Sequence, residues 1–125
     1  MTLQWILSGL AFKAARWRPV GLLVGWFFSH MSFVLPVQRL RQTPTLVAFY
    51  HPQPAHAVHV LIVPRRAISG LDALQPQDQD FLIDLFQVVQ SLVRELGLHE
   101  RGYRLVANGG RSQDIPQLHF HLIAD

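Results

Sequence analysis

Residues 117–125 read Gln-Leu-His-Phe-His-Leu-Ile-Ala-Asp, and their alternation predicts a β-strand with two different faces. Gln117, His119 and His121 share one face. The other face is wholly apolar, with Leu118, Phe120 and Leu122. An apolar face suits a core, whereas a face with two imidazoles suits a chemical site, because histidine titrates near neutrality and acts as nucleophile, proton carrier or metal ligand. The alternative is a half-buried edge strand whose histidines have no chemical role.

The composition gives room for one compact domain and excludes thiol chemistry. The 125 residues include no cysteine, so disulfides and thiolate ligands are unavailable. A zinc site would need histidine and carboxylate ligands, and His119 and His121 lack a clear third and fourth ligand, so we predict neither a metal nor a cofactor. The sequence contains no Walker-type glycine loop, dinucleotide fingerprint or His-Glu-x-x-His element.

Basic residues dominate the first half of the chain. Those before the first acidic residue, Asp72, are Lys13, Arg16, Arg18, Arg39, Arg41, Arg65 and Arg66. Charge of one sign indicates an anionic neighbour, either phospholipid headgroups or phosphates. A nucleic acid is not the expected partner, because the basic half lacks the interleaved aromatic and base-reading elements of such domains.

The N-terminal segment, residues 1–34, is apolar, carries all three tryptophans and is expected to be helical. Residues 19–37 carry no formal charge, a length just sufficient to cross a bilayer, and arginines flank both ends. One interpretation is a membrane anchor, spanning or monotopic, although polar residues and Pro36 interrupt the run. The others are a buried helix in a dimer and a translation start at Met31. A signal peptide is not expected, because no small-residue cleavage site follows.

The remainder, residues 35–125, is predicted to be a second unit of the α+β class. Short β-prone or apolar runs predict strands at 45–50, 58–63, 103–108 and 117–124. One long helix is predicted from about Gln77 to Leu96, ended by Gly97. Its apolar positions recur at threes and fours: Leu82, Leu85, Phe86, Val89, Leu92, Val93 and Leu96.

Several polar residues at turns and strand ends are further candidates for a chemical role. They are His51, His56 and His59 near a proline-rich turn, Asn108 before Gly109-Gly110, Ser112, Gln113 and Asp114 before the last strand, and the pair Arg65-Arg66. Each also has an ordinary explanation as a structural histidine, a turn residue or a solvated charge. Together they favour phosphorus chemistry, in which one imidazole attacks, neighbouring donors stabilise the oxyanion and a second imidazole exchanges protons.

The ordered motifs resemble those of the histidine-triad (HIT) family. Residues 117–123, Gln-φ-His-φ-His-φ-φ, are similar to its signature His-φ-His-φ-His-φ-φ. The likeness continues upstream, where residues 35–37 and 45–49 resemble the opening strands, residues 54–66 resemble Pro…His-φ-φ-φ-φ-Pro-Lys-Lys, and residues 102–108 match the strand before the phosphate loop, whose glutamine corresponds to Gln113. The resemblance covers about residues 33–125.

The resemblance implies an α+β fold with an antiparallel sheet and one long helix, commonly paired into a homodimer. It implies a nucleotide hydrolase or transferase acting on a phosphoramidate, a phosphoanhydride or an adenylated small molecule, in the cytoplasm or on the cytoplasmic face of a membrane. His119 would attack an α-phosphate to give a nucleotidyl-histidine, supported by His121 and His59. The implied nucleotide-binding residues are Phe49, Tyr50, His51, Asn108, Ser112, Gln113 and Asp114.

Three positions depart from the family pattern. Gln117 replaces the first triad histidine, which is harmless if that position acts through its backbone carbonyl and slows the reaction if its imidazole is needed. His51 stands where an acidic ribose ligand is common, and Asp114 stands where a hydroxyl is usual, so that a carboxylate lies near an anionic substrate. A non-catalytic nucleotide-binding module tethered to a membrane is therefore the alternative function.

Overall fold

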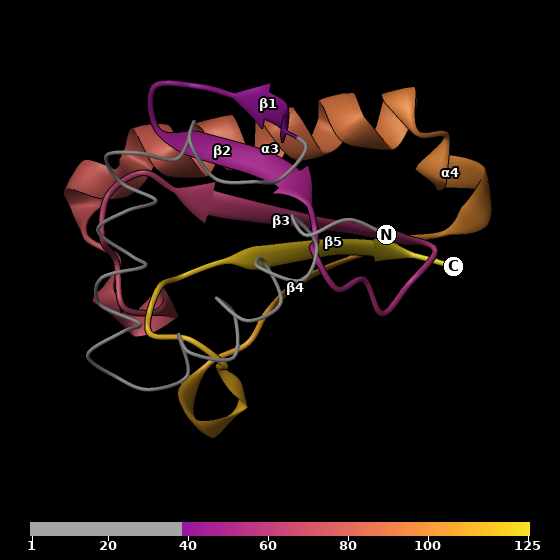
Figure 1. The fold of residues 1–125 in the computed structure, drawn as a ribbon. Coiled ribbons are helices and arrows are strands. Elements are labelled where there is room, and N and C mark those ends of the chain that lie inside the picture. The colour runs from indigo at the N-terminus through magenta and orange to yellow at the C-terminus, as the bar shows by residue number, and fades with distance from the viewer. Residues whose placement is uncertain (1–38) are drawn as a thin grey trace.

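The computed structural model describes residues 39–125, which form a five-stranded antiparallel sheet and one long helix (Figure 1). The strands are β1 (Arg39–Gln42), β2 (Leu46–Tyr50), β3 (Val58–Pro64), β4 (Arg104–Ala107) and β5 (Phe120–Ala124). Their order in the sheet is β1-β2-β3-β5-β4, and all neighbours are antiparallel. The predicted α+β class with an antiparallel sheet is confirmed.

The predictions for the N-terminal segment lie outside the described residues. They include the helical segment 1–34 with its anchor interpretation, the boundary between residues 34 and 35, and the opening strand at residues 35–37. Between residues 39 and 125, no helix has the length and apolar character needed to cross a membrane.

One face of the sheet packs against helix α3 (Gln79–Glu95) and builds the core. Strand alternation sends every second side chain of β2, β3 and β5 to this face. Its buried members include Leu46, Ala48, Val60, Ile62, Phe120 and Leu122 from the sheet and Phe81, Leu85, Val88, Val89 and Leu92 from the helix. Full burial of one large apolar side chain stabilises the fold by about 1.5–3 kcal/mol. This face is therefore committed to the core, and the odd-numbered histidines of β3 and β5 lie on the opposite face.

The predicted long helix is confirmed, with two differences. Short 3-10 turns, η2 (Leu71–Ala73) and η3 (Pro76–Asp78), lead into the helix, so that it starts slightly later than predicted. Phe86 is 58% exposed, because it follows Leu85 by one residue and so points about 100° away from the buried stripe.

The end of α3 follows the predicted position. Gly97 has a left-handed backbone with φ of 63°, which a residue without a side chain adopts without strain. The short helix α4 (Leu98–Arg101), which the sequence patterns did not predict, comes directly after it, and a further 3-10 turn, η4 (Gly110–Ser112), lies between β4 and β5.

The last strand is shorter than the alternation predicts. β5 begins at Phe120, whereas the pattern extends to Gln117. Continuing its register with β3 would bring Leu118 opposite Pro64, which has no N–H to donate to the ladder. The N–H of Leu118 instead donates to the carbonyl of Ile68, at 2.7 Å. Residues 117–119 therefore leave the sheet and contact the loop that follows β3.

Candidate active site

Three imidazoles meet on the sheet face opposite α3. His59 on β3 and His121 on β5 share this face, because Leu61 pairs with His121 and Ile123 pairs with His59. Nε2 of His59 lies 2.9 Å from Nδ1 of His121, within hydrogen-bond distance. The ring of His119, just before β5, lies 5.0 Å from that of His121 between centroids. The fold thus brings together the histidines that the sequence patterns single out.

Backbone groups determine which nitrogens of His59 and His121 carry protons. The N–H of Ala55 donates to Nδ1 of His59 at 3.1 Å, and a backbone N–H can only donate. In the neutral ring, Nε2 of His59 therefore carries the proton and donates to Nδ1 of His121. On the same basis we assign the proton of His121 to Nε2. The two rings form a chain of hydrogen bonds that runs in one direction, from Ala55 to His121.

His119 has the opposite tautomer. Its Nδ1 lies 2.8 Å from the carbonyl oxygen of Gln117, and a carbonyl can only accept. Nδ1 therefore carries the proton, and Nε2 keeps its lone pair. A neutral imidazole held in this way presents a nucleophilic nitrogen.

Nε2 of His121 is a buried donor without an acceptor among the described residues. A buried polar group left unpaired costs about 1–3 kcal/mol. Unpaired groups of this kind are rare in folded proteins and often mark a functional role. The lone pair of His119 and the N–H of His121 therefore form a nucleophile and a donor on adjacent rings.

The pKa values of the imidazoles keep the site neutral. Burial, reinforced by repulsion from neighbouring histidines, lowers the pKa of His51 and of His121 to about 4. Burial also lowers the pKa of His59, with a smaller contribution from His56. Burial lowers the pKa of His119, opposed by its hydrogen bond to Gln117 and by the charge of Asp114. Neutral rings agree with the hydrogen-bond directions assigned above.

We expect the protein to lose stability between pH 7 and pH 5. The unfolded chain takes up protons on these histidines near pH 6.5, whereas the folded protein resists protonation of His51 and His121 until about pH 4. The unfolded state therefore binds more protons in this interval, and the free energy of unfolding falls as the pH falls. Allowing for solvent screening, a loss of about 1 kcal/mol would lower Tm by roughly 5 °C.

Thermal unfolding at pH 7 and pH 5 measures this loss. The buried carboxylate of Asp78 contributes little above pH 5, since its ion pair with Arg66 lowers its pKa. Removing one titrating ring in His121→Phe should reduce the difference in Tm. An equal Tm at both pH values in the wild-type protein would contradict the expectation.

The residues expected around a nucleoside are not all on the same side. His51 follows β2, its ring centroid lies 4.4 Å from that of His59, and its Nδ1 accepts the N–H of Gln53 at 2.9 Å. Phe49 is fully buried and shares the histidine face through its pairing with Leu61. Tyr50 packs against the α3 core on the opposite face, so the structure does not bring it to the histidines.

The phosphate-loop candidates lie between β4 and β5. Asn108 directly follows β4, and Ser112 is exposed in η4. Gln113 uses its side-chain amide within the fold, donating to the carbonyls of Ser69 at 2.6 Å and Ile115 at 2.9 Å. Asp114 is exposed, and its negative charge acts to raise the pKa values of His119 and His121 against the lowering effect of burial. Of these four, Asp114 has the clearest electrostatic link to the histidines.

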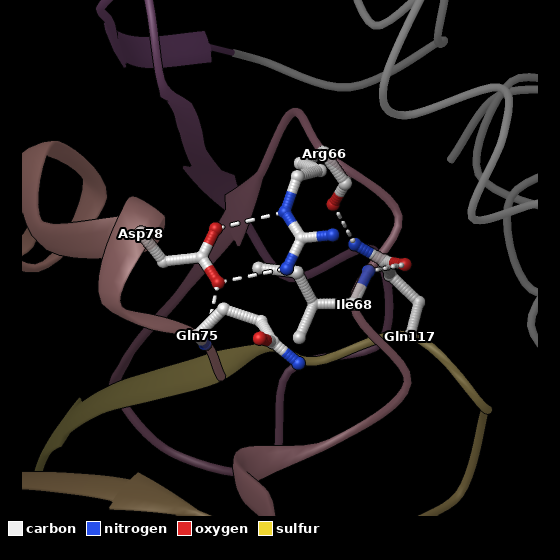
Figure 2. A network of polar contacts seen from close by, with 5 residues as sticks. All are labelled: Arg66, Ile68, Gln75, Asp78 and Gln117. Atoms are coloured by element: carbon white, nitrogen blue, oxygen red, sulfur yellow. Dashed lines mark hydrogen bonds and ion pairs between the residues drawn. The ribbon is translucent and has the colours of Figure 1, made fainter. Parts of the chain in front are cut away.

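The arginine pair after β3 makes bonds within the protein. Nε and Nη2 of Arg66 donate to the two carboxylate oxygens of Asp78 at 2.8 and 2.7 Å (Figure 2). Nε of Arg65 donates to the carbonyl of Thr43 at 2.7 Å. Arg66 thus forms an ion pair with Asp78. The sequence pattern predicts either a phosphate ligand or a solvated charge at this position, and not this ion pair.

Sequence reasoning missed Ala55 and Asp78. Ala55 acts through its backbone N–H, which leaves no trace in a side-chain pattern. Asp78 lies at the N-cap of α3 and is buried, and an acidic residue at a predicted helix start is a signal that could have identified it. Within residues 39–125, no three histidine or carboxylate side chains are placed to hold a metal ion.

Comparison with known proteins agrees with the fold and the motif order. The family model for the HIT domain matches residues 32–125. An uncharacterized HIT-like protein of Helicobacter pylori is 26% identical over 92 residues, which are 72% of this chain and 86% of that protein.

Two solved structures are also similar. A HIT family hydrolase from Clostridium thermocellum has a TM-score of 0.71 and 30% identity, covering 79% of this chain and 88% of that one. A histidine triad nucleotide-binding protein from Candida albicans has a TM-score of 0.66 and 31% identity, covering 77% of this chain and 71% of that one. With its sheet, its paired histidines and a family match over residues 32–125, the chain belongs to the histidine-triad (HIT) family.

Proposed function

We propose that this protein is a nucleotide hydrolase or transferase that attacks an α-phosphate through a nucleotidyl-histidine intermediate. The substrate class is a phosphoramidate, a phosphoanhydride or an adenylated small molecule. The observation that carries the proposal is the hydrogen-bond geometry of two adjacent rings, from which we assign a lone pair to Nε2 of His119 and a proton to Nε2 of His121. A similar structure is described as a HIT family hydrolase, and another as a nucleotide-binding protein, which supports this class of activity.

The reaction would proceed in two displacements. Nε2 of His119 attacks the α-phosphorus, a P–N bond forms, and the bond from phosphorus to the leaving amine or oxygen breaks. The leaving group takes a proton from solvent, and the Gln117 carbonyl stabilises the imidazolium that forms on His119. Water, or another acceptor in a transferase, then attacks the phosphorus and gives up its proton to solvent. The P–N bond to His119 breaks, its electron pair returns to Nε2, and the nucleotide is released.

His121 would stabilise the charge that develops on the phosphoryl oxygens. Its buried Nε2–H is directed by the chain from Ala55 through His59, so the donor is organised before the substrate binds. A preorganised donor in a site of low polarity stabilises a transition state more than a solvated one does. We assign His59 to this supporting role and Gln117 to the first triad position.

The remaining site residues fall into two groups in this proposal. His51 would contact the nucleoside from the histidine face, with the buried Phe49 supporting this wall from within, and Asn108, Ser112 and Gln113 would lie along the phosphates. Tyr50 would act indirectly, since it supports the sheet from the core side. A homodimer and attachment of residues 1–34 to the cytoplasmic face of a membrane stay predictions.

A non-catalytic nucleotide-binding module is the second candidate, and Asp114 favours it. The carboxylate is close enough to influence the pKa values of both His119 and His121. A negative charge there repels the anionic phosphate and opposes attack on it.

Incubation with an adenosine phosphoramidate of an alkylamine separates the two candidates. We expect release of AMP and of the free amine in equal amounts, measured by chromatography. Binding of AMP in a calorimeter without any release would reject the enzyme and support the binding module. Neither binding nor release would reject both.

A further inference from the structure

The side chain of Gln117 is enclosed by the loop after β3 (Figure 2). It is 1% exposed. Its Oε1 accepts the N–H of Ile68 at 3.2 Å, and its Nε2 donates to the carbonyls of Arg66 at 3.0 Å and Pro64 at 3.4 Å. Both ends of the amide are therefore used on the backbone of one loop, and none of these bonds reaches a histidine.

The backbone beside Gln117 is attached to the same loop. The N–H of Leu118 donates to the carbonyl of Ile68 at 2.7 Å. Together with the amide, this bond fixes the peptide group between Gln117 and Leu118. The carbonyl of that peptide group accepts the Nδ1–H of His119 at 2.8 Å. The direction of the carbonyl, and with it the tautomer of His119, therefore depends on the contacts of Gln117.

The loop that holds Gln117 is itself anchored to α3. The carbonyl of Arg66 accepts a hydrogen bond from the side-chain amide of Gln117, and its guanidinium forms a bidentate ion pair with Asp78 at the N-cap of the helix. The N–H of Gln75 donates to the same carboxylate at 2.9 Å. Asp78 is 5% exposed, and the Arg66 guanidinium keeps its pKa below the ordinary range, so the pair stays ionised. The support for His119 thus extends from the start of α3 through Arg66 to Gln117 (Figure 2).

We propose that Gln117 is a positioning residue, whose buried amide orients the carbonyl that holds His119 in its nucleophilic tautomer. The inference deepens the proposed function and rests on it. An amide suits the position because it offers a donor and an acceptor at once and does not titrate near neutral pH. A neutral imidazole also offers one donor and one acceptor, whereas a leucine of similar size offers neither.

The test compares Gln117→Leu, Gln117→Asn and Gln117→His with the wild-type protein. Leucine is preferred to alanine because a cavity of about 310 Å³ borders Arg66, Ile68 and Gln117, and water from it would replace a deleted side chain. Asparagine keeps the amide but is one methylene shorter, so it cannot reach both sides of the loop. Histidine tests whether another neutral donor and acceptor restores the function.

Two measurements report on positioning. The first is the nitrogen–proton NMR spectrum of the imidazoles without substrate, which identifies the tautomer of His119. The second is kcat and KM for release of AMP from the adenosine phosphoramidate. We expect a single Nδ1–H tautomer in the wild-type protein and mixed tautomers in Gln117→Leu. We expect its kcat to fall by about 10–100-fold with little change in KM, because a small misplacement of a reacting group has effects of this size.

Gln117→His should recover most of the kcat and the single tautomer. The matched control is Asp84→Ala. Asp84 lies on α3, away from the histidines, and its carboxylate accepts hydrogen bonds from the hydroxyls of Thr43 and Thr45. The control substitution should lower Tm and leave kcat and the His119 tautomer unchanged. If Gln117→Leu does not fold, Gln117→Asn takes its place with the same expected changes.

A wild-type tautomer together with a wild-type kcat in either folded variant would overturn the positioning role. Equal loss in Asp84→Ala would also overturn it, since the effect would then follow stability alone. If the wild-type protein releases no AMP, the proposed function fails, and the spectrum of His119 still decides whether Gln117 sets its tautomer.

Discussion

Replacing His119 by alanine should remove the activity, with a fall in kcat of roughly 10³-fold or more, because no other group in the site can form the covalent intermediate. In His59 and His121 the unprotonated nitrogen already accepts a hydrogen bond, from Ala55 and from His59, whereas the unprotonated Nε2 of His119 is available to attack. Its removal takes away the nucleophile and not the binding surface. AMP should therefore bind to the variant with an affinity close to that of the wild-type protein.

Mass spectrometry of the acid-quenched reaction gives a direct test. The wild-type protein should carry one nucleotide, and peptide mapping should locate it on His119. His99→Asn is the matched control, because His99 is an exposed imidazole on α4, outside the candidate site. Nucleotide attached to another histidine, or turnover that survives in His119→Ala, would show that the assignment is wrong.

Replacing His121 by phenylalanine should lower kcat by about 10²-fold and change KM much less, because a preorganised donor acts mainly on the transition state. Phenylalanine keeps the ring volume and removes both nitrogens. The donor at Nε2 is lost, and the proton on Nε2 of His59 loses its acceptor. The nucleotidyl-enzyme should still form on His119, more slowly than in the wild-type protein.

The rate constants for formation and for hydrolysis of the nucleotidyl-histidine, compared between His121→Phe and the wild-type protein, identify the role of His121. A donor to phosphate should affect both formation and hydrolysis of the intermediate in single-turnover measurements. A role confined to protonating the leaving group would affect formation alone. An unchanged kcat in a folded His121→Phe protein would reject either role.

Much of the fold was predictable from local patterns. The alternation of apolar residues in β2, β3 and β5 and the spacing of three and four in α3 each reflect burial on one face, which depends on the geometry of a single element. The helix ends before Gly97 as predicted, because the left-handed backbone conformation at this position favours glycine, which has no side chain. The start of β5 was not predictable in this way, since it depends on Pro64 in a strand far upstream.

The candidate site was predictable as a set of residues and not as a set of bonds. Alternation places His119 and His121 on one face, and the family resemblance adds His59, whose place beside them follows from the register of β3 with β5. Gln113 and Arg66 have the right chemical type for phosphate, but within the fold their side chains bind Ser69, Ile115 and Asp78. The hydrogen-bond partner of a polar side chain on a loop depends on which residue the fold places beside it, and local sequence patterns do not predict that residue.

The order of residues 117–125 alone predicts an apolar face and a face with two histidines, because the alternation of side chains is a property of the extended backbone. Folding adds the proton positions. The tautomer of His59 follows from the N–H of Ala55, that of His121 follows from His59, and that of His119 follows from the Gln117 carbonyl. The amide of Gln117 finds its partners 49 and 51 residues upstream, at Ile68 and Arg66, so its role comes from contacts that the chain makes only once it is folded.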